Sequence, residues 1–144
     1  MIFLPATPAQ LKAIAKGQDL AGPLQAFSPN KALRETFDIS LDSDEEADFA
    51  ALQVASVFAL ATFGARFVLV VDVSAQPSQL EAGNGGVEVK TIPADKVMAW
   101  FSDDEPAPRE LVESLRGKNI DEAWLAANDF MNEHDLSWHD ISEA

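Results

Sequence analysis

The arrangement of hydrophobic and polar positions predicts several strands along this chain. Residues 66–73 form a continuous, largely β-branched apolar run, which is typical of a central strand covered on both faces. Residues 87–92 alternate between apolar and polar, which predicts a half-exposed strand. Residues 97–101 predict another strand, close enough to pair with the preceding one through the turn around Pro93. Residues 2–7 predict a first strand, which ends near a proline.

A longer apolar segment predicts one central helix at residues 44–63. It is apolar nearly all round after Phe49, so we expect it to be buried within the fold. Ser43 and Glu46 have the spacing of a capping box at its start, and Gly64 follows its end.

Shorter helices are predicted by start and stop signals. Thr7 and Gln10 fit a capping box around a helix that Gly17 ends. Another helix is expected over residues 30–37 after a Ser-Pro start, and one more over residues 107–116. The mixed stretch before residue 28 is compatible with a short strand that contains Leu24, Ala26 and Phe27.

The C-terminal segment predicts a final helix at about residues 129–141, capped by Asn128 or Asp129, whereas residues 119–126 are compatible with either a helical turn or a strand. Within the final helix, four side chains at steps of four, four and three share one face: Phe130, His134, Trp138 and Ile141.

The two histidines would then point in different directions, about 140° apart around the helix axis. We expect His134 to be half-buried beside a backbone or carboxylate partner, and His139 to lie on the surface near Asp135. The alternative is His134 as a general base beside a groove.

Together these elements predict one α/β or α+β domain over residues 1–144. We expect a mixed sheet of four to six strands packed with helices, including the long buried central helix.

Charge and composition narrow the classes of function. The net charge is −14, and residues 103–144 hold 12 acidic and 3 basic side chains. Such a surface repels phosphate backbones and anionic lipid, so we expect neither direct nucleic-acid nor membrane binding, and a basic protein as the partner. The absence of cysteine fits a reducing compartment, and we expect a soluble, cytoplasmic protein.

Motifs for known chemistries are incomplete. Residues 38–49 resemble a calcium loop, but Ser43 replaces the required glycine and Phe49 the bidentate glutamate. Residues 83–86 lack the Lys-Ser/Thr of a phosphate loop. No serine lies in a nucleophile-elbow pattern, so we expect no catalytic residue, metal or cofactor and lean against an enzyme.

A small-molecule site remains the alternative. It would lie at the strand ends near Thr7, Arg34 and Asp72, with His134 or Trp138 on its wall. Arg34 is suited to clamp an anion, although an interhelix ion pair explains it as well. Asp72 is explained equally by the end of a strand.

The order of several segments resembles a family of small uncharacterised actinobacterial proteins. The segments are "IFLPAT", "FSPNKALRETF", "DEEADFAALQVAS", "RFVLVVDV", "VEVKTIPADKVMAWFSDD" and "EHDLSWHDISE", and they cover nearly the whole chain. The family is a domain of unknown function, so the resemblance implies no activity or catalytic residue. Where its members tend to have Trp-Tyr near the end, this chain has Trp138 and His139. This difference weakens a shared catalytic role for His139.

We therefore expect a cytoplasmic, non-catalytic interaction or regulatory domain with an acidic surface. Oligomeric state is left open by the sequence.

Overall fold

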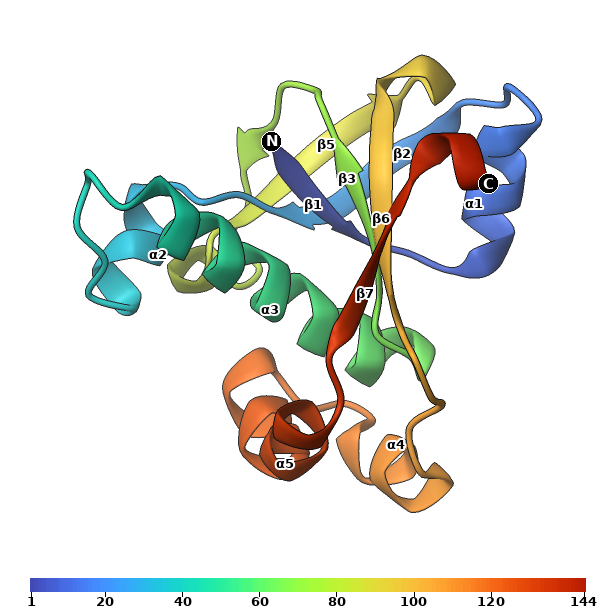
Figure 1. The fold of residues 1–144 in the computed structure, drawn as a ribbon. Helices are drawn as coiled ribbons and strands as arrows, with labels where there is room; N and C mark the ends of the chain where they lie inside the picture. Colours follow the sequence, from blue (N-terminus) through green and yellow to red (C-terminus); the bar gives the residue numbers. More distant parts are fainter.

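A computed structural model describes residues 1–144 and shows one antiparallel sheet of seven strands with five α-helices (Figure 1). The strands lie in the order β4-β5-β2-β1-β3-β6-β7. Their bounds are β1 Ile2–Pro5, β2 Leu20–Phe27, β3 Phe67–Val71, β4 Gln76–Pro77, β5 Gly86–Ile92, β6 Val97–Asp103 and β7 Leu136–Asp140. The helices are α1 Pro8–Ala15, α2 Lys31–Thr36, α3 Asp44–Phe63, α4 Arg109–Leu115 and α5 Ile120–Glu133, with short 3-10 turns η1 Ala82–Asn84, η2 Ala94–Lys96 and η3 Ile141–Glu143.

The predicted fold class is confirmed: the chain is one α+β domain whose sheet packs against helices, with one long central helix. The sheet differs from the expected mixed sheet of four to six strands, because every strand pair is antiparallel. Two strands, β4 and β7, were not predicted from the sequence. The strand β4 has only two residues, and β7 is formed by residues that we expected to be helical.

The sheet buries a separate apolar cluster on each face. On one face α3 crosses the strands, and α4 and α5 pack beyond it (Figure 1). On the other face α1 and the C-terminal turn cover a smaller cluster. Alternation along β1 divides its side chains, so that Phe3 faces α3 whereas Ile2 and Leu4 face α1.

The central helix α3 has the predicted bounds. Ten of its side chains are buried, and Gly64 ends it in the left-handed conformation, with φ of 85°. Ser43 occupies the cap position but makes no side-chain cap hydrogen bond, so the predicted capping box is wrong. By length and composition α3 could cross a membrane, but 56% of its most apolar window is buried inside the fold, as in the core helix of a soluble protein.

Local start signals elsewhere had mixed outcomes. The capping box of Thr7 and Gln10 is present at α1. The cap of α2 is Asn30, whose side chain accepts from the amide of Leu33, rather than the Ser-Pro start.

The predicted hairpin of β5 and β6 is wrong. The strand β5 pairs with β2 and β4, whereas β6 pairs with β3 and β7, so three strands separate them. Residues 93–96 therefore cross the end of the sheet instead of forming a tight turn. The amide of Asp72 donates to the carbonyl of Lys96 at 2.9 Å and holds this crossing against the end of β3.

The predicted final helix is also wrong. Residues 119–126 form the cap and the first part of α5: a capping box of Asn119 and Glu122 starts the helix, which ends before His134. The chain then becomes extended and pairs with the outer edge of β6, with Trp138 opposite Phe101. The spacing of the aromatic side chains fitted a helix, but backbone pairing with the open edge of β6 determined the structure of this segment.

Candidate functional site

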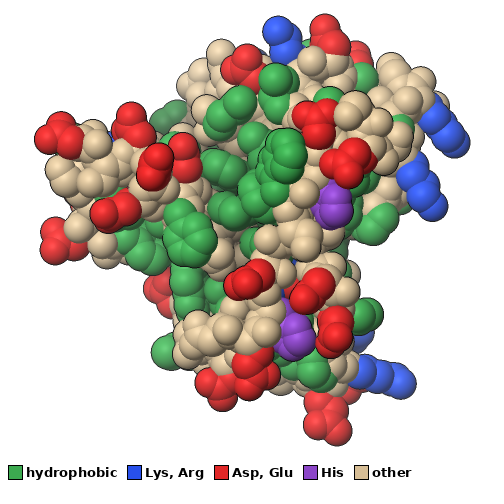
Figure 2. Space-filling model, viewed as in Figure 1, with side chains coloured by type: hydrophobic (Ala, Val, Ile, Leu, Met, Phe, Trp, Pro, Cys, Tyr) green, Lys and Arg blue, Asp and Glu red, His purple; other side chains and the backbone are tan.

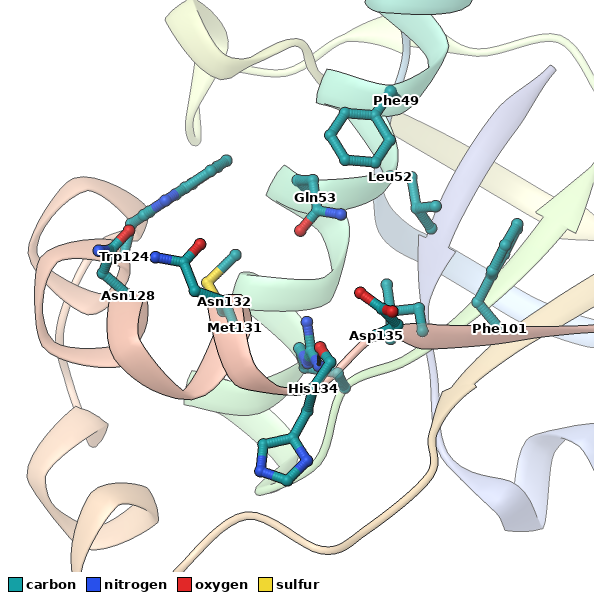
Figure 3. Close-up of a pocket in the computed structure, with 12 residues that line it drawn as sticks. Phe49, Leu52, Gln53, Phe101, Trp124, Asn128, Met131, Asn132, His134 and Asp135 are labelled. Carbon is teal, nitrogen blue, oxygen red and sulfur yellow. Dashed lines mark hydrogen bonds between the residues drawn. The ribbon is translucent and has the colours of Figure 1, made fainter.

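A groove of about 720 Å³ lies between α3, α5 and the adjacent ends of β6 and β7 (Figure 3). Half of the residues that line it are hydrophobic. The lining residues are Phe49, Leu52, Gln53, Arg66, Phe101, Trp124, Asn128, Met131, Asn132, His134, Asp135 and Leu136. Because the groove combines apolar walls with polar groups, it can bind an apolar side chain or a small amphipathic molecule.

Large apolar side chains at the groove are unusually exposed. Phe49 on α3 is 62% exposed and Trp138 on β7 is 58% exposed. Trp138 is paired with Phe101, so it lies on the sheet face that forms the groove, although it is not part of the lining. Figure 2 shows hydrophobic side chains gathered in a hollow of this face, with acidic side chains on both sides of it and Lys and Arg only towards the edges of the view.

A buried ion pair supports one end of the groove. The guanidinium of Arg66, whose side chain is 1% exposed, donates from Nε to Oδ1 of Asp103 at 2.9 Å, and its Nη2 donates to the same oxygen. The same Nη2 donates to the carbonyl of His134 at 2.6 Å, and the guanidinium lies 5.2 Å from the ring centroid of Phe130. Arg66 thus joins the start of β3, the end of β6 and the end of α5.

The other oxygen of Asp103, Oδ2, is buried without a hydrogen-bond partner. Burial raises the pKa of Asp103, while the hydrogen bonds and positive charge of Arg66 oppose the rise. The pair is therefore held with one carboxylate oxygen uncompensated, which makes it sensitive to any change at either residue.

The structure places His134 half-buried, as expected, at the end of α5. Its ring stacks on Phe130 with centroids 4.6 Å apart, and its Nδ1 lies 3.4 Å from Oδ1 of Asp104. His139, expected on the surface, is also half-buried, and its ring stacks on Trp100 at 4.8 Å on the opposite face of the sheet. The expected pairing of His139 with Asp135 also requires a helix that does not form there.

A contact between Ser102 and His139 is the nearest approach to a nucleophile and base. The serine Oγ lies 3.2 Å from Nε2 of the histidine, across β6 and β7. No carboxylate hydrogen-bonds the other ring nitrogen, and neither residue lines the groove. The contact therefore stabilises the strand pair and lacks the orienting group of a triad. No group of three His, Cys, Asp or Glu side chains is arranged to hold a metal ion.

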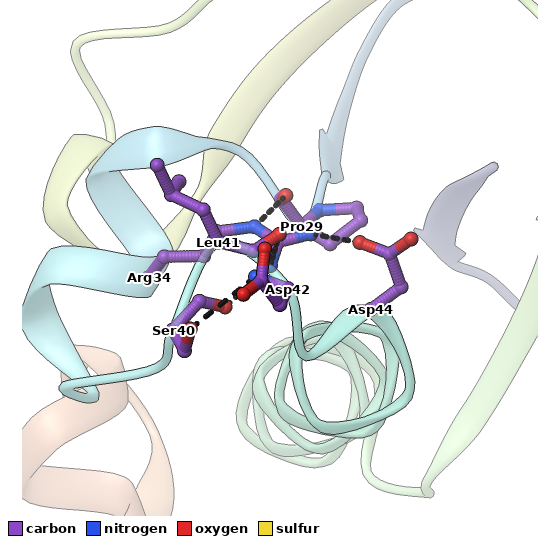
Figure 4. A network of polar contacts seen from close by, with 6 residues as sticks. All are labelled: Pro29, Arg34, Ser40, Leu41, Asp42 and Asp44. Atoms are coloured by element: carbon purple, nitrogen blue, oxygen red, sulfur yellow. Dashed lines mark hydrogen bonds and ion pairs between the residues drawn. The ribbon is translucent and has the colours of Figure 1, made fainter.

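Arg34 serves the connection between α2 and α3 (Figure 4). Its Nε donates to the carbonyl of Pro29 at 3.3 Å, its Nη1 to that of Ser40 at 3.0 Å, and its Nη2 to Oδ1 of Asp44 at 2.9 Å. All three nitrogens have protein partners, so this side chain holds the loop against the start of α3.

The five sequence-predicted site residues do not meet in one pocket. Thr7 caps α1 just beyond the end of β1, whereas Asp72 follows the end of β3. Because β1 and β3 are antiparallel, these two residues lie at opposite ends of the sheet. Arg34 borders a separate pocket, and only His134 and Trp138 are at the groove.

Phe49, Arg66, Phe101 and Asp103 were not singled out as site residues by sequence reasoning. One signal was present: Arg66 immediately precedes the apolar strand β3, and a charge next to a buried strand needs a partner. Nothing local indicated that Asp103, 37 residues later, provides it.

Comparison with known proteins gives a family but no activity. The whole chain, residues 1–144, matches the model of a family described as "Family of unknown function (DUF6912)". No curated protein and no solved structure matches it.

Proposed function

The chain belongs to the DUF6912 family, and because that family has no known function, we propose from the groove itself that the protein is a cytoplasmic, non-catalytic interaction domain. Its partner is a protein segment that carries a large apolar side chain beside basic residues. The observation that carries the proposal is the exposure of Phe49 and Trp138, 62% and 58%, beside an apolar groove with acidic side chains on both sides.

Two properties of this surface support a protein partner. Exposed aromatic side chains beside a concave apolar surface are typical anchors of protein interfaces. Asp135 lines the groove, and Glu45 lines a neighbouring pocket that shares Phe49 with it. These acidic side chains favour a cationic partner and speed its approach.

Peptide selection tests this proposal without assuming a sequence. The wild-type protein is used to select binders from a phage-displayed library of short random peptides, and the best binder is synthesised. We expect a large apolar residue flanked by Lys or Arg. The double variant F49A/W138A should lose at least about tenfold in affinity, as expected when interface anchors are removed.

The matched control is L125A, because Leu125 on α5 is 83% exposed and does not line the groove. This variant should bind the peptide as the wild type does. Binding should also weaken as salt rises from low to moderate concentration, since the attraction is partly electrostatic. Selection of acidic peptides would contradict the proposal. So would a peptide affinity that changes neither in F49A/W138A nor with salt concentration.

A second candidate is a small-molecule-binding domain. It is favoured by the volume of the groove, about 720 Å³, which lies within the range of ligand pockets. Native mass spectrometry of the untagged protein, isolated gently from its own cells, separates the two. A small retained mass that F49A/W138A loses favours this candidate, whereas a retained protein favours the first.

A further inference from the structure

The strand β7 is an open edge of the sheet next to the groove. It is the last strand in the sheet order and has five residues, whereas the strand at the opposite edge, β4, has two. An edge strand presents backbone N–H and C=O groups that another extended segment can pair with. In Figure 1, β7 runs along the outside of β6 with no strand on its other side.

One hydrogen bond indicates which backbone groups of β7 are free. The amide of Asp140 donates to Oε2 of Glu143 at 2.7 Å, so it points away from β6. In an antiparallel ladder, successive residues point alternately towards and away from the neighbouring strand. The amides of Leu136 and Trp138 therefore also point outwards, whereas Glu143 closes the end of the edge at Asp140.

The free edge and the groove share the same side chains. Leu136 lines the groove, and Trp138 lies on the same sheet face, two residues along. Alternate side chains of a segment added to β7 would project towards that face, because side chains in neighbouring strands point to the same side at paired positions. A five-residue pairing is about 17 Å long at roughly 3.3 Å per residue.

Charge decides between a second copy of this chain and a different partner. Asp135 precedes β7, Asp140 ends it, and Glu143 follows, with no Lys or Arg between residues 135 and 144. Hydrogen bonds from Ser142 lower the pKa of Asp140, so this carboxylate stays ionised. Pairing of two β7 strands in antiparallel would bring these carboxylates together, which opposes a dimer through this edge.

We infer that the partner binds as an extended strand added to the free edge of β7. Its residues are alternately apolar, facing the groove, and polar, with Lys or Arg at the ends where Asp135 and Asp140 lie. This inference rests on the proposed function, because it specifies how the partner segment enters the same surface.

Amide hydrogen exchange of the full chain tests the inference, with the synthetic peptide chosen by selection as the probe. Peptide at saturation should slow exchange at the amides of Leu136 and Trp138 by at least about tenfold, because both gain backbone partners. The amides of Ser137 and His139, which already point towards β6, should change much less.

A second measurement uses the peptide backbone. N-methylation of single peptide amides should abolish binding at alternate positions, since only every second amide pairs with β7. A side-chain-only contact predicts no such alternation.

The outcomes separate this inference from the proposed function. Binding that depends on Phe49 and Trp138 but leaves exchange in β7 unchanged would keep the interaction domain and overturn strand addition. A selection that yields no binding peptide would contradict the proposed function itself. Protection of Trp138 that grows with protein concentration without peptide, together with a dimer mass in ultracentrifugation, would show that the edge binds a second copy and would also overturn the inference.

Discussion

Arg66 and Asp103 form an ion pair whose side chains are only 1% and 7% exposed, and which lies where β3, β6 and the end of α5 meet. The pair links residues far apart in the chain and supports one end of the groove. It also has a weakness, because Oδ2 of Asp103 is buried without a hydrogen-bond partner. Two predictions depend on this relationship.

Removal of one partner of this pair should strongly destabilise the protein. R66M leaves the buried carboxylate of Asp103 uncompensated, so we expect the free energy of unfolding to fall by about 3–5 kcal/mol. The double variant R66M/D103L, which removes both charges, should recover much of that loss. The exposed pair of Arg109 and Glu113 is the control, and R109M should cost less than about 1 kcal/mol. Urea unfolding measures all three, and equal losses for R66M and R109M would contradict the importance of burial.

The raised pKa of Asp103 predicts a dependence of stability on pH. The folded state holds this proton more tightly than the unfolded state, whose carboxyl titrates near about 4. The contribution of Asp103 is therefore fully present below that pH and is lost as the pH rises through the folded-state pKa. The difference in unfolding free energy between the wild type and D103N should fall with rising pH.

Asp140 provides the opposite case for the same experiment. Hydrogen bonds from Ser142 lower its pKa, so its contribution is present above about pH 4 and is lost as the pH falls through the folded-state pKa. The difference between the wild type and D140N should therefore rise with pH. Urea unfolding between about pH 3 and pH 7 measures both slopes. A difference that rises with pH for D103N as well would show that Arg66 outweighs burial at Asp103.

The caps of two helices should differ in their contributions. The side chain of Asn119 accepts from the amide of Glu122 at 2.9 Å, so N119A should lower the free energy of unfolding by about 1 kcal/mol. Ser43 makes no such bond at the start of α3, so S43A should change it by less than about 0.5 kcal/mol. Thermal and urea unfolding of the two variants provide the comparison. A loss at Ser43 as large as that at Asn119 would indicate a cap that the structure does not contain.

His139 should contribute to stability, unlike a side chain that lies fully on the surface. The variant H139A loses the stack on Trp100 and the contact with Ser102, so we expect a loss of about 1–2 kcal/mol. S102A should cost less, and the double variant should cost less than the sum, because the two side chains share one contact. Additive losses in urea unfolding would mean that the contact between Ser102 and His139 contributes nothing.

The sequence by itself determined the elements whose signals are local. The apolar content of residues 44–63 and the glycine that follows them were enough to predict α3. Both signals lie within the segment itself, so they can be recognised without knowing which distant residues pack against it. The strand β3 and the capping box at Thr7 were likewise predictable from neighbouring residues. The single domain with a sheet and packed helices followed from these elements.

The tertiary structure decided which strands pair and therefore where the groove lies. Proximity in sequence suggested a hairpin of β5 and β6, but β6 pairs with β3 instead. This pairing leaves the other edge of β6 open. Residues 136–140 form a strand along that edge, although the spacing of aromatic side chains in this segment fitted a helix. The ion pair of Arg66 and Asp103 exists only because this arrangement brings the start of β3 to the end of β6. Backbone pairing and burial between distant segments have no signal within a short window of sequence, and they placed Phe49, Trp138 and the free edge of β7 on one surface.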